Sequence, residues 1–395
     1  MKIENLIELN YKKLDNKIRR AVIEKVKDAN KQDFYLYFRY SRKTRRLEKF
    51  IYKIGNEVIR YKHIPYFGVI VNNTTGRWIL DYYIDNIKTP ITEFSEQINN
   101  LSWIDISVEY SIDHLFRKSD KVLTRLWNLD VIGKYEINCN GRGIAVAVID
   151  TGIDYNHIEL KEKFSRDKGY NFINNSKDPF DDNSHGTHVA GIIAGNSCGV
   201  APGVKLYALK VLDYNGYGTE FDIIRALEWC LDKNVKVVNM SLGAPYASFA
   251  FEELCEICSN NMYLVAAAGN EGKYMAEYPA AFDNSVISVA SINSSKFRSY
   301  FSNIHETIDI SAPGEDIYSS IPYNRYEWFS GTSMATPHIS GAIAVYLSKF
   351  KRNIKEGEEI MKRSAEKLDY NDTPYPTEYL YGAGLVRIDK MLKKN

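Results

Sequence analysis

A serine among small residues is the first candidate for chemistry in this sequence. Ser333 lies in the run Gly-Thr-Ser-Met-Ala-Thr-Pro at 331–337, and the apolar run that follows predicts a buried helix. The start of a helix offers free backbone N–H groups and the positive end of the helix dipole. Pro337 indicates that the helix is only beginning there, because a proline further in removes a backbone hydrogen bond. A hydroxyl is a weak nucleophile alone, so Ser333 is either a helix cap or one member of a catalytic set.

The other members of such a set occur elsewhere in the chain. Residues 144–149 form an unbroken apolar run, typical of a strand buried on both faces, and the run ends in Asp150. In α/β folds the carboxyl ends of strands carry the chemistry. His185 opens a Gly- and Ala-rich segment that predicts a second helix. A third apolar run ends in Asn270, whose amide could hold negative charge on a substrate oxygen.

Four motifs in this order resemble the subtilisin-like serine proteases, the subtilases. They are Val-Ile-Asp-Thr-Gly-Ile-Asp at 148–154, His-Gly-Thr-His-Val-Ala-Gly at 185–191, Ala-Ala-Ala-Gly-Asn-Glu-Gly at 266–272 and the serine motif at 331–337. The resemblance extends from about Gly141 to Gly384. It implies a serine endopeptidase that acts on proteins or peptides through an acyl-enzyme intermediate.

The resemblance also implies a role for each residue of the set. Ser333 is the expected nucleophile, His185 the general base and acid, and Asp150 the group that orients the imidazole. Asn270, together with the backbone N–H of Ser333, is expected to hold the oxyanion. His188, one turn after the base, is expected to be structural.

Substrate is expected to bind by adding a strand between Gly-containing segments at 216–218 and 241–243, although plain turns there are the alternative. The segment 266–268 is expected to form an apolar wall. The predicted substrate-binding residues are Ser241, Leu242, Gly243, Gly216, Tyr217, Gly218, Leu212, Ala267, Gly269 and Glu277.

Glu277 leaves the substrate preference open. In subtilases the floor of the pocket for the residue before the cut lies beside a Tyr-Pro similar to Tyr278-Pro279, and it is often small. A carboxylate there would favour Lys or Arg. The alternative is a solvated loop carboxylate and an apolar preference.

From Gly141 onward, alternating strands and helices predict an α/β fold with a doubly wound, mainly parallel sheet, and the resemblance implies that it is subtilisin-like. The expected strands are 144–150, 205–212, 236–242, 262–268 and 286–290, and the expected helices are 185–194, 220–232, 249–260 and 332–348.

The N-terminal part reads as a small ferredoxin-like α+β domain of order βαββαβ. Its expected strands are 34–40, 57–61, 66–71 and 103–108, its helices are 45–54 and 91–101, and a further helix is expected at 6–29. This domain is similar to the inhibitory propeptide of subtilases. We therefore expect a propeptide-like domain at 1–115, a catalytic domain at 116–395, and self-cleavage between Tyr110 and Lys121. Leu115-Phe116 and Arg117-Lys118 are the apolar and basic candidate cut sites.

Composition narrows the remaining classes. The sequence has 395 residues, 45% hydrophobic residues and a net charge of +1, so it shows no electrostatic footprint for nucleic acid. No apolar run is long enough to cross a membrane. The start lacks a secretory signal, which favours the cytoplasm unless a leader is missing. The expected partners are substrate and the chain's own N-terminal domain, and the expected state is a monomer.

Metal and cysteine patterns are weak. Many secreted subtilases have a long calcium loop after the histidine motif, but residues 194–202 are short and contain no carboxylate. Glu159 alone supplies too few ligands for calcium, so a tight calcium site is doubtful and no cofactor is expected to be required. Weaker binding of calcium at another site stays open. Cys255 and Cys258 are expected to be small buried residues of a helix, with the five cysteines reduced.

Two other classes compete with the protease. A nucleotide-binding oxidoreductase would need its Gly-rich turn after a strand, whereas Gly-Arg-Gly at 141–143 precedes one. An inert pseudoprotease, held by its N-terminal domain, is the remaining alternative.

Overall fold

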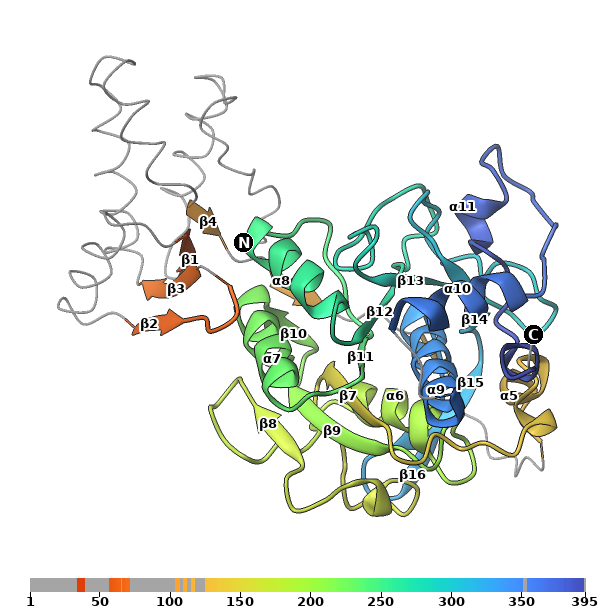
Figure 1. Ribbon diagram of the computed structural model, residues 1–395, viewed down its shortest axis with the longest axis horizontal. Coiled ribbons are helices and arrows are strands. Elements are labelled where there is room, and N and C mark those ends of the chain that lie inside the picture. Colours follow the sequence, from red (N-terminus) through yellow and green to blue (C-terminus); the bar gives the residue numbers. More distant parts are fainter. Residues whose placement is uncertain are drawn as a thin grey trace. The chain divides into compact units, whose positions relative to one another are not determined.

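The computed structural model of the chain describes residues 34–39, 57–64, 66–71, 104–106, 109–111, 115–117, 125–350 and 354–393 (Figure 1). The chain divides into two compact units, Met1–Glu109 with Tyr246–Leu254, and Tyr110–Pro245 with Cys255–Asn395. The domain bounds expected from the sequence, 1–115 and 116–395, stay a prediction. The helices expected at 6–29, 45–54 and 91–101 lie outside the described residues.

The first unit contains a four-stranded antiparallel sheet of order β2-β3-β1-β4. Its strands are β1 (Phe34–Arg39), β2 (Glu57–Arg60), β3 (Tyr66–Val71) and β4 (Ile104–Ile106). The strands coincide with the expected ones to within two residues at each end. Their order agrees with the ferredoxin-like arrangement predicted from the sequence.

The second unit is built on a parallel sheet of seven strands in the order β14-β13-β12-β11-β7-β9-β8. Its strands are β7 (Ala145–Asp150), β8 (Gly169–Asn171), β9 (Lys205–Lys210), β11 (Val237–Met240), β12 (Tyr263–Ala267), β13 (Ile287–Ile292) and β14 (Ile310–Pro313). Nearly every residue of these strands is buried, because helices cover both faces of the sheet. The α/β, mainly parallel fold expected from the sequence is thus confirmed.

Helices α6 (His185–Ala194) and α9 (Thr332–Phe350) pack against each other and against the sheet, while α7 (Glu220–Asp232) lies on the other face (Figure 1). Every residue of α6 is buried, as are residues 332–347 of α9. Small residues permit this: Gly341 of α9 lies directly against Val200, and a Cβ there would clash with it. The remaining helices are α5 (Trp127–Val131), α8 (Phe249–Ser259), α10 (Ile354–Ser364), α11 (Glu378–Tyr381) and α12 (Ile388–Met391), with short 3-10 turns η2 (Lys134–Glu136) and η3 (Lys161–Lys163).

Two small sheets border the loops that carry the site. The strands β15 (Ile317–Ile321), β16 (Arg325–Ser330) and β6 (Leu115–Arg117) form an antiparallel sheet, and β16 leads directly into α9. The strands β10 (Tyr217–Thr219) and β5 (Glu109–Ser111) pair in a second sheet. None of these five strands was among those expected from the sequence.

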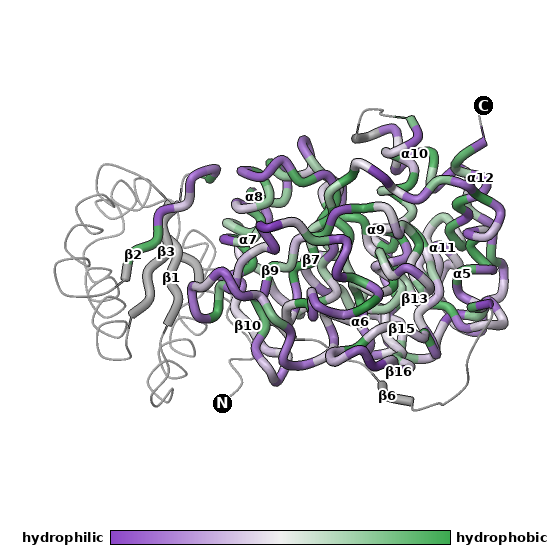
Figure 2. Tube along the Cα trace, turned by 90° about the horizontal axis from the view of Figure 1, so that it is seen from below, coloured by the Kyte–Doolittle hydropathy of each residue, from purple (hydrophilic) through white to green (hydrophobic). Residues whose placement is uncertain are grey.

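Hydropathy follows this layering. The strands of the central sheet and α9 run largely through hydrophobic colours, whereas many outer loops are hydrophilic (Figure 2). Among the described residues, none of the helices combines the length and the apolar character needed to cross a membrane.

Candidate active site

The carboxylate and the imidazole predicted from the sequence meet at the end of the central sheet. Asp150 is the last residue of β7, and its Oδ1 lies 2.8 Å from Nδ1 of His185, the first residue of α6. Both side chains are fully buried. The backbone N–H of Thr151 donates to the same Oδ1 at 2.7 Å. The carboxylate therefore holds the Nδ1 proton of the imidazole, which leaves Nε2 as the nitrogen that can accept a proton.

A second buried carboxylate fixes the start of α6. Asp181 accepts hydrogen bonds from the backbone N–H groups of Asn183 at 2.9 Å, Ser184 at 3.0 Å and Thr187 at 2.9 Å. The hydroxyl of Thr151 also donates to it, at 2.8 Å. Burial raises the pKa of Asp181, although these hydrogen bonds oppose the shift. The loop before His185 is thereby tied to the residue after Asp150.

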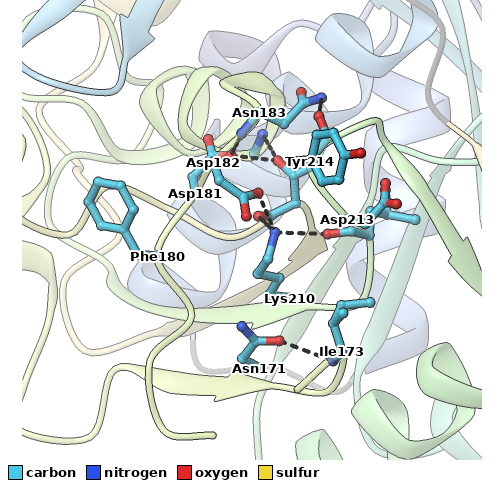
Figure 3. A network of polar contacts seen from close by, with 12 residues as sticks. Asn171, Ile173, Phe180, Asp181, Asp182, Asn183, Lys210, Asp213 and Tyr214 are labelled. Carbon is cyan, nitrogen blue, oxygen red and sulfur yellow. Dashed lines mark hydrogen bonds and ion pairs between the residues drawn. The ribbon is translucent and has the colours of Figure 1, made fainter. Parts of the chain in front are cut away.

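Lys210 is a buried cation beside this pair. Its ammonium donates to the carbonyl oxygens of Thr151 at 2.7 Å and Leu212 at 2.9 Å, and to Oδ1 of Asp182 at 2.7 Å (Figure 3). Asn183 donates from its side-chain amide to the carbonyl of Tyr214 at 2.9 Å. Three segments, those after β7, before α6 and after β9, are therefore held together by one network.

Ser333 is the second residue of α9 and is held by residue 241. The Ser333 hydroxyl donates to the carbonyl oxygen of Ser241 at 3.1 Å, and the Ser241 hydroxyl donates to the carbonyl oxygen of Ser333 at 2.8 Å. Pro337, expected at the beginning of the helix, is the sixth residue of α9. Its missing N–H is the one that would have paired with the Ser333 carbonyl, and Ser241 takes its place.

Asn270 is oriented by the residue before the serine. Its side-chain oxygen accepts hydrogen bonds from the backbone N–H of Thr332 at 2.8 Å and from the Thr332 hydroxyl at 3.0 Å. The same hydroxyl accepts from the N–H of Gly269 at 3.2 Å. Because the amide oxygen is engaged on this side, the NH₂ group points the other way, as an oxyanion donor requires.

The predicted substrate-binding residues fall into two groups. Leu212 is fully buried and bridges to Gly218, while Tyr217 of β10 is 46% exposed and Gly216 adopts a φ of 82°. The second group lies in the segments that lead from Ser241 and into Asn270. Ser241 contacts Ser333 as above, Leu242, Ala267 and Ala268 are buried, and the carboxylate of Glu277 lies against both Gly243 and Gly269.

Side chains of the protein itself bind Glu159 and the loop 194–202, where the sequence makes a tight calcium site doubtful. The carboxylate of Glu159 accepts from the Ser197 N–H and hydroxyl, both at 2.7 Å, and from the Tyr326 hydroxyl at 2.9 Å. Burial alone would raise the pKa of Glu159, but these hydrogen bonds outweigh it and the net shift is downward. The ammonium of Lys163 donates to Oδ1 of Asn196 and to the carbonyl of Pro202, both at 2.6 Å.

These groups do not fit a divalent cation, because three donors already bind the one carboxylate and an ammonium occupies the neighbouring oxygens. Across the parts of the chain that the structure describes, no group of three or more His, Cys, Asp or Glu side chains could hold a metal ion.

The other histidines and cysteines singled out in the sequence are buried structural groups. His188 lies 3.1 Å through Nε2 from the carbonyl of Glu327 and stacks on Phe329 with ring centroids 4.2 Å apart. Cys255 and Cys258 are buried free thiols, and burial raises the pKa of Cys258 to about 12, which disfavours a reactive thiolate.

Sequence reasoning missed three residues of the site: Thr332, Asp181 and Lys210. Lys210 carried a usable signal, because it is a charged residue inside the apolar run at 206–212. Thr332 and Asp181 had no such signal in the sequence, because the fold brings them to their hydrogen-bond partners Asn270 and Thr187.

Comparisons with known proteins agree with this geometry. A family model, the subtilase family, matches residues 141–383. The chain is similar to a thermophilic serine proteinase from Bacillus sp. (strain AK1), with 39% identity over 246 residues, 60% of each chain. It is also similar to subtilisin E from Bacillus subtilis (strain 168), with 39% identity over 263 residues, 63% of this chain and 65% of that one. Subtilisin DY from Bacillus licheniformis is 37% identical over 259 residues, 63% of this chain and 90% of that one.

The chain thus spans less than two thirds of the length of the first two of these relatives. The matched family segment covers more than half of the chain, and it contains all four motifs. The chain belongs to the subtilase family.

Proposed function

We propose that this protein is a serine endopeptidase that hydrolyses peptide bonds in proteins. The observation that carries the proposal is the buried Asp150–His185 pair, with 2.8 Å between Oδ1 and Nδ1, in a fold where Ser333 lies in the first turn of the neighbouring helix α9. The relatives named above are serine proteinases and subtilisins, which supports the same activity here.

In the proposed reaction the Ser333 hydroxyl turns from the Ser241 carbonyl toward His185 and attacks the substrate carbonyl. His185 takes the hydroxyl proton at Nε2, and Asp150 stabilises the imidazolium that forms. The carbonyl oxygen becomes an oxyanion, which the amide of Asn270 and the backbone N–H of Ser333 hold. His185 then gives its proton to the leaving amine, and water releases the acyl group by the same steps in reverse.

We further propose that the chain is its own first substrate. The strand β5 pairs with β10, which carries the predicted substrate edge Tyr217 and Gly218, and β6 pairs with β16, which leads into Ser333. Substrates of proteases often add a strand to such edges. Both strands lie within or next to the expected window from Tyr110 to Lys121, which supports a cut inside that window.

A serine-directed fluorophosphonate probe and an intact-mass measurement test both parts. The full chain should label with the probe and appear as two fragments, while Ser333→Ala should do neither and remain one chain of 395 residues. Ser295→Ala, on an exposed loop, is the matched control and should behave like the wild type. Failure of the full chain to label would favour the pseudoprotease, and fragments of Ser333→Ala made without another protease would rule out self-cleavage.

A further inference from the structure

Two glycines beside the proposed catalytic centre face one carboxylate. Gly243 lies two residues after Ser241, which contacts Ser333. Gly269 directly precedes Asn270, the proposed oxyanion residue. A Cβ built on Gly269 would lie 2.9 Å from Oε2 of Glu277, and a Cβ on Gly243 would come closer still. The carboxylate therefore occupies the space that a side chain at Gly243 would take, and it shares the space at Gly269 with the side-chain amide of Asn303.

The backbone that carries this carboxylate is fixed. The N–H of Ala244 donates to the carbonyl of Tyr278 at 3.0 Å, and the N–H of Tyr278 donates to the carbonyl of Ala244 at 2.8 Å. The N–H of Ala281 donates to the carbonyl of Glu277 at 2.8 Å. The residue after Glu277 is therefore hydrogen-bonded to the residue after Gly243, and Glu277 itself is half-buried rather than fully solvated.

The position matters because of where a substrate must lie. In the proposed reaction the substrate carbonyl is between the Ser333 hydroxyl and the amide of Asn270. The residue that supplies this carbonyl then has its side chain next to the backbone flanking those two groups, which is where Gly243 and Gly269 lack side chains. Beside Gly243 the first group that such a side chain would meet is the Glu277 carboxylate, and beside Gly269 it would meet the side-chain amide of Asn303 and then the same carboxylate.

The surroundings favour a cationic side chain. Leu242, Ala267 and Ala268, which flank the two glycines, are at most 5% exposed. The nearby side-chain amide of Asn303 donates to another carboxylate, Oε2 of Glu271, at 2.6 Å. A substrate side chain that brings both positive charge and hydrogen-bond donors is stabilised beside such a carboxylate, and more strongly where the surrounding groups are apolar.

We propose that Glu277 is the specificity-determining residue of this protease, and that it selects Lys or Arg immediately before the scissile bond. This inference rests on the proposed endopeptidase function. Of the two preferences that the sequence left open, basic and apolar, it favours the basic one.

The test uses peptides that differ only in the residue before the cut: Lys, Arg, Leu, Phe and norleucine. Norleucine has an unbranched apolar side chain of similar reach to lysine but no ammonium, so the Lys/norleucine ratio of kcat/KM isolates the charge. The full chain, after self-cleavage, should favour Lys and Arg over norleucine. Glu277→Gln should lower kcat/KM for Lys and Arg by about 10- to 100-fold, the range for a lost hydrogen bond to a charged group, and leave norleucine nearly unchanged.

Two further variants control the result. Glu256→Gln removes the same charge from the exposed side of α8 and should keep the wild-type ratio. Glu277→Asp keeps the charge and should retain a preference for Lys or Arg over norleucine. Active-site titration with the fluorophosphonate corrects every rate for the folded fraction, so a poorly folding variant still reports its ratio.

The possible outcomes distinguish a failure of the proposed Glu277 role from a failure of the proposed endopeptidase activity. Activity on all peptides with equal Lys and norleucine rates, or a preference for Leu and Phe that survives in Glu277→Gln, would overturn the role of Glu277 but leave the protease intact. Absence of both labelling and cleavage in the full chain would overturn the proposed function and this inference with it.

Discussion

The hydroxyl of Ser241 donates a 2.8 Å hydrogen bond to the backbone carbonyl of Ser333, at the position where Pro337 cannot supply a helical N–H. The loop after β11 thereby completes the first turns of α9. Because Ser333 itself is buried, its carbonyl would otherwise lose a hydrogen-bond partner inside the protein.

Replacing Ser241 by Ala should therefore lower the free energy of unfolding by about 1–3 kcal/mol, the cost of an unsatisfied buried acceptor. Pro337→Ala restores the backbone N–H, so the same Ser241 substitution should cost less in that background. Urea unfolding in the Ser333→Ala background, which avoids self-digestion and keeps the carbonyl, measures both values. Equal costs in the two backgrounds would show that the hydrogen bond does not substitute for the missing N–H.

Thr332→Val should lower kcat by about tenfold with little change in KM. The substitution keeps the shape of the side chain but removes the hydroxyl that donates to Asn270 and accepts from the N–H of Gly269. A less well-oriented amide stabilises the oxyanion less, whereas complete loss of such an amide costs about 10²–10³ in kcat, a value measured on subtilisin itself. Thr332→Ser retains the hydroxyl and should retain the rate; a loss equal to that of the valine variant would point to the methyl group instead.

Stability should fall as the pH drops from about 6.5 to about 4, in part because of His338. Its Nδ1 donates to the Met334 carbonyl at 2.9 Å, its Nε2 accepts from the amide of Asn128 at 2.8 Å, and burial lowers its pKa to about 4. The unfolded chain binds a proton near its ordinary value, so protonation favours unfolding below that pH. At 1.36 kcal/mol per pH unit the loss reaches up to about 3 kcal/mol.

Unfolding by urea between pH 7 and pH 4 measures this contribution as the difference between wild type and His338→Gln. Glutamine cannot titrate, so the variant should lose less stability over the same interval. An identical pH dependence in both proteins would exclude His338 as its source.

A calcium chelator should leave the melting temperature nearly unchanged. Lys163→Met should lower the melting temperature by about 5 °C, because two hydrogen bonds from a buried ammonium are lost. Lys161→Met is the matched control, since that lysine is exposed in the same short turn η3. A large drop on chelation would reveal a bound ion, and equal effects of the two lysine substitutions would show that the Lys163 contacts contribute little.

The residues proposed to carry the chemistry could be predicted because each lies at the end or in the first turn of a strongly patterned element. Asp150 closes an apolar strand, and His185 and Ser333 open Gly- and Ala-rich helices, so local sequence located α6, α7 and α9 to within two residues. The central strands were located for the same reason, and the parallel sheet followed from their alternation with helices.

What could not be predicted depends on partners distant in the sequence. The strand β15 contains the adjacent buried residues Ser319 and Ser320, which a polar–apolar pattern assigns to a loop. Their hydroxyls donate to the carbonyls of His188 at 2.8 Å and Thr187 at 3.2 Å, so burial is compensated by α6. The orientation of Asn270 by Thr332 could not be predicted for the same reason, since the two residues are distant in the sequence.

The ammonium of Lys163 also bears on how the loop at 194–202 responds to its surroundings. An ion taken from solution stabilises a fold only in proportion to its concentration relative to its dissociation constant. A cation carried on the chain's own side chain is always present at the same effective concentration, whatever the dilution or the composition of the medium. The contacts from Lys163 to Asn196 and Pro202 therefore form with folding itself and cannot be titrated away by removing metal.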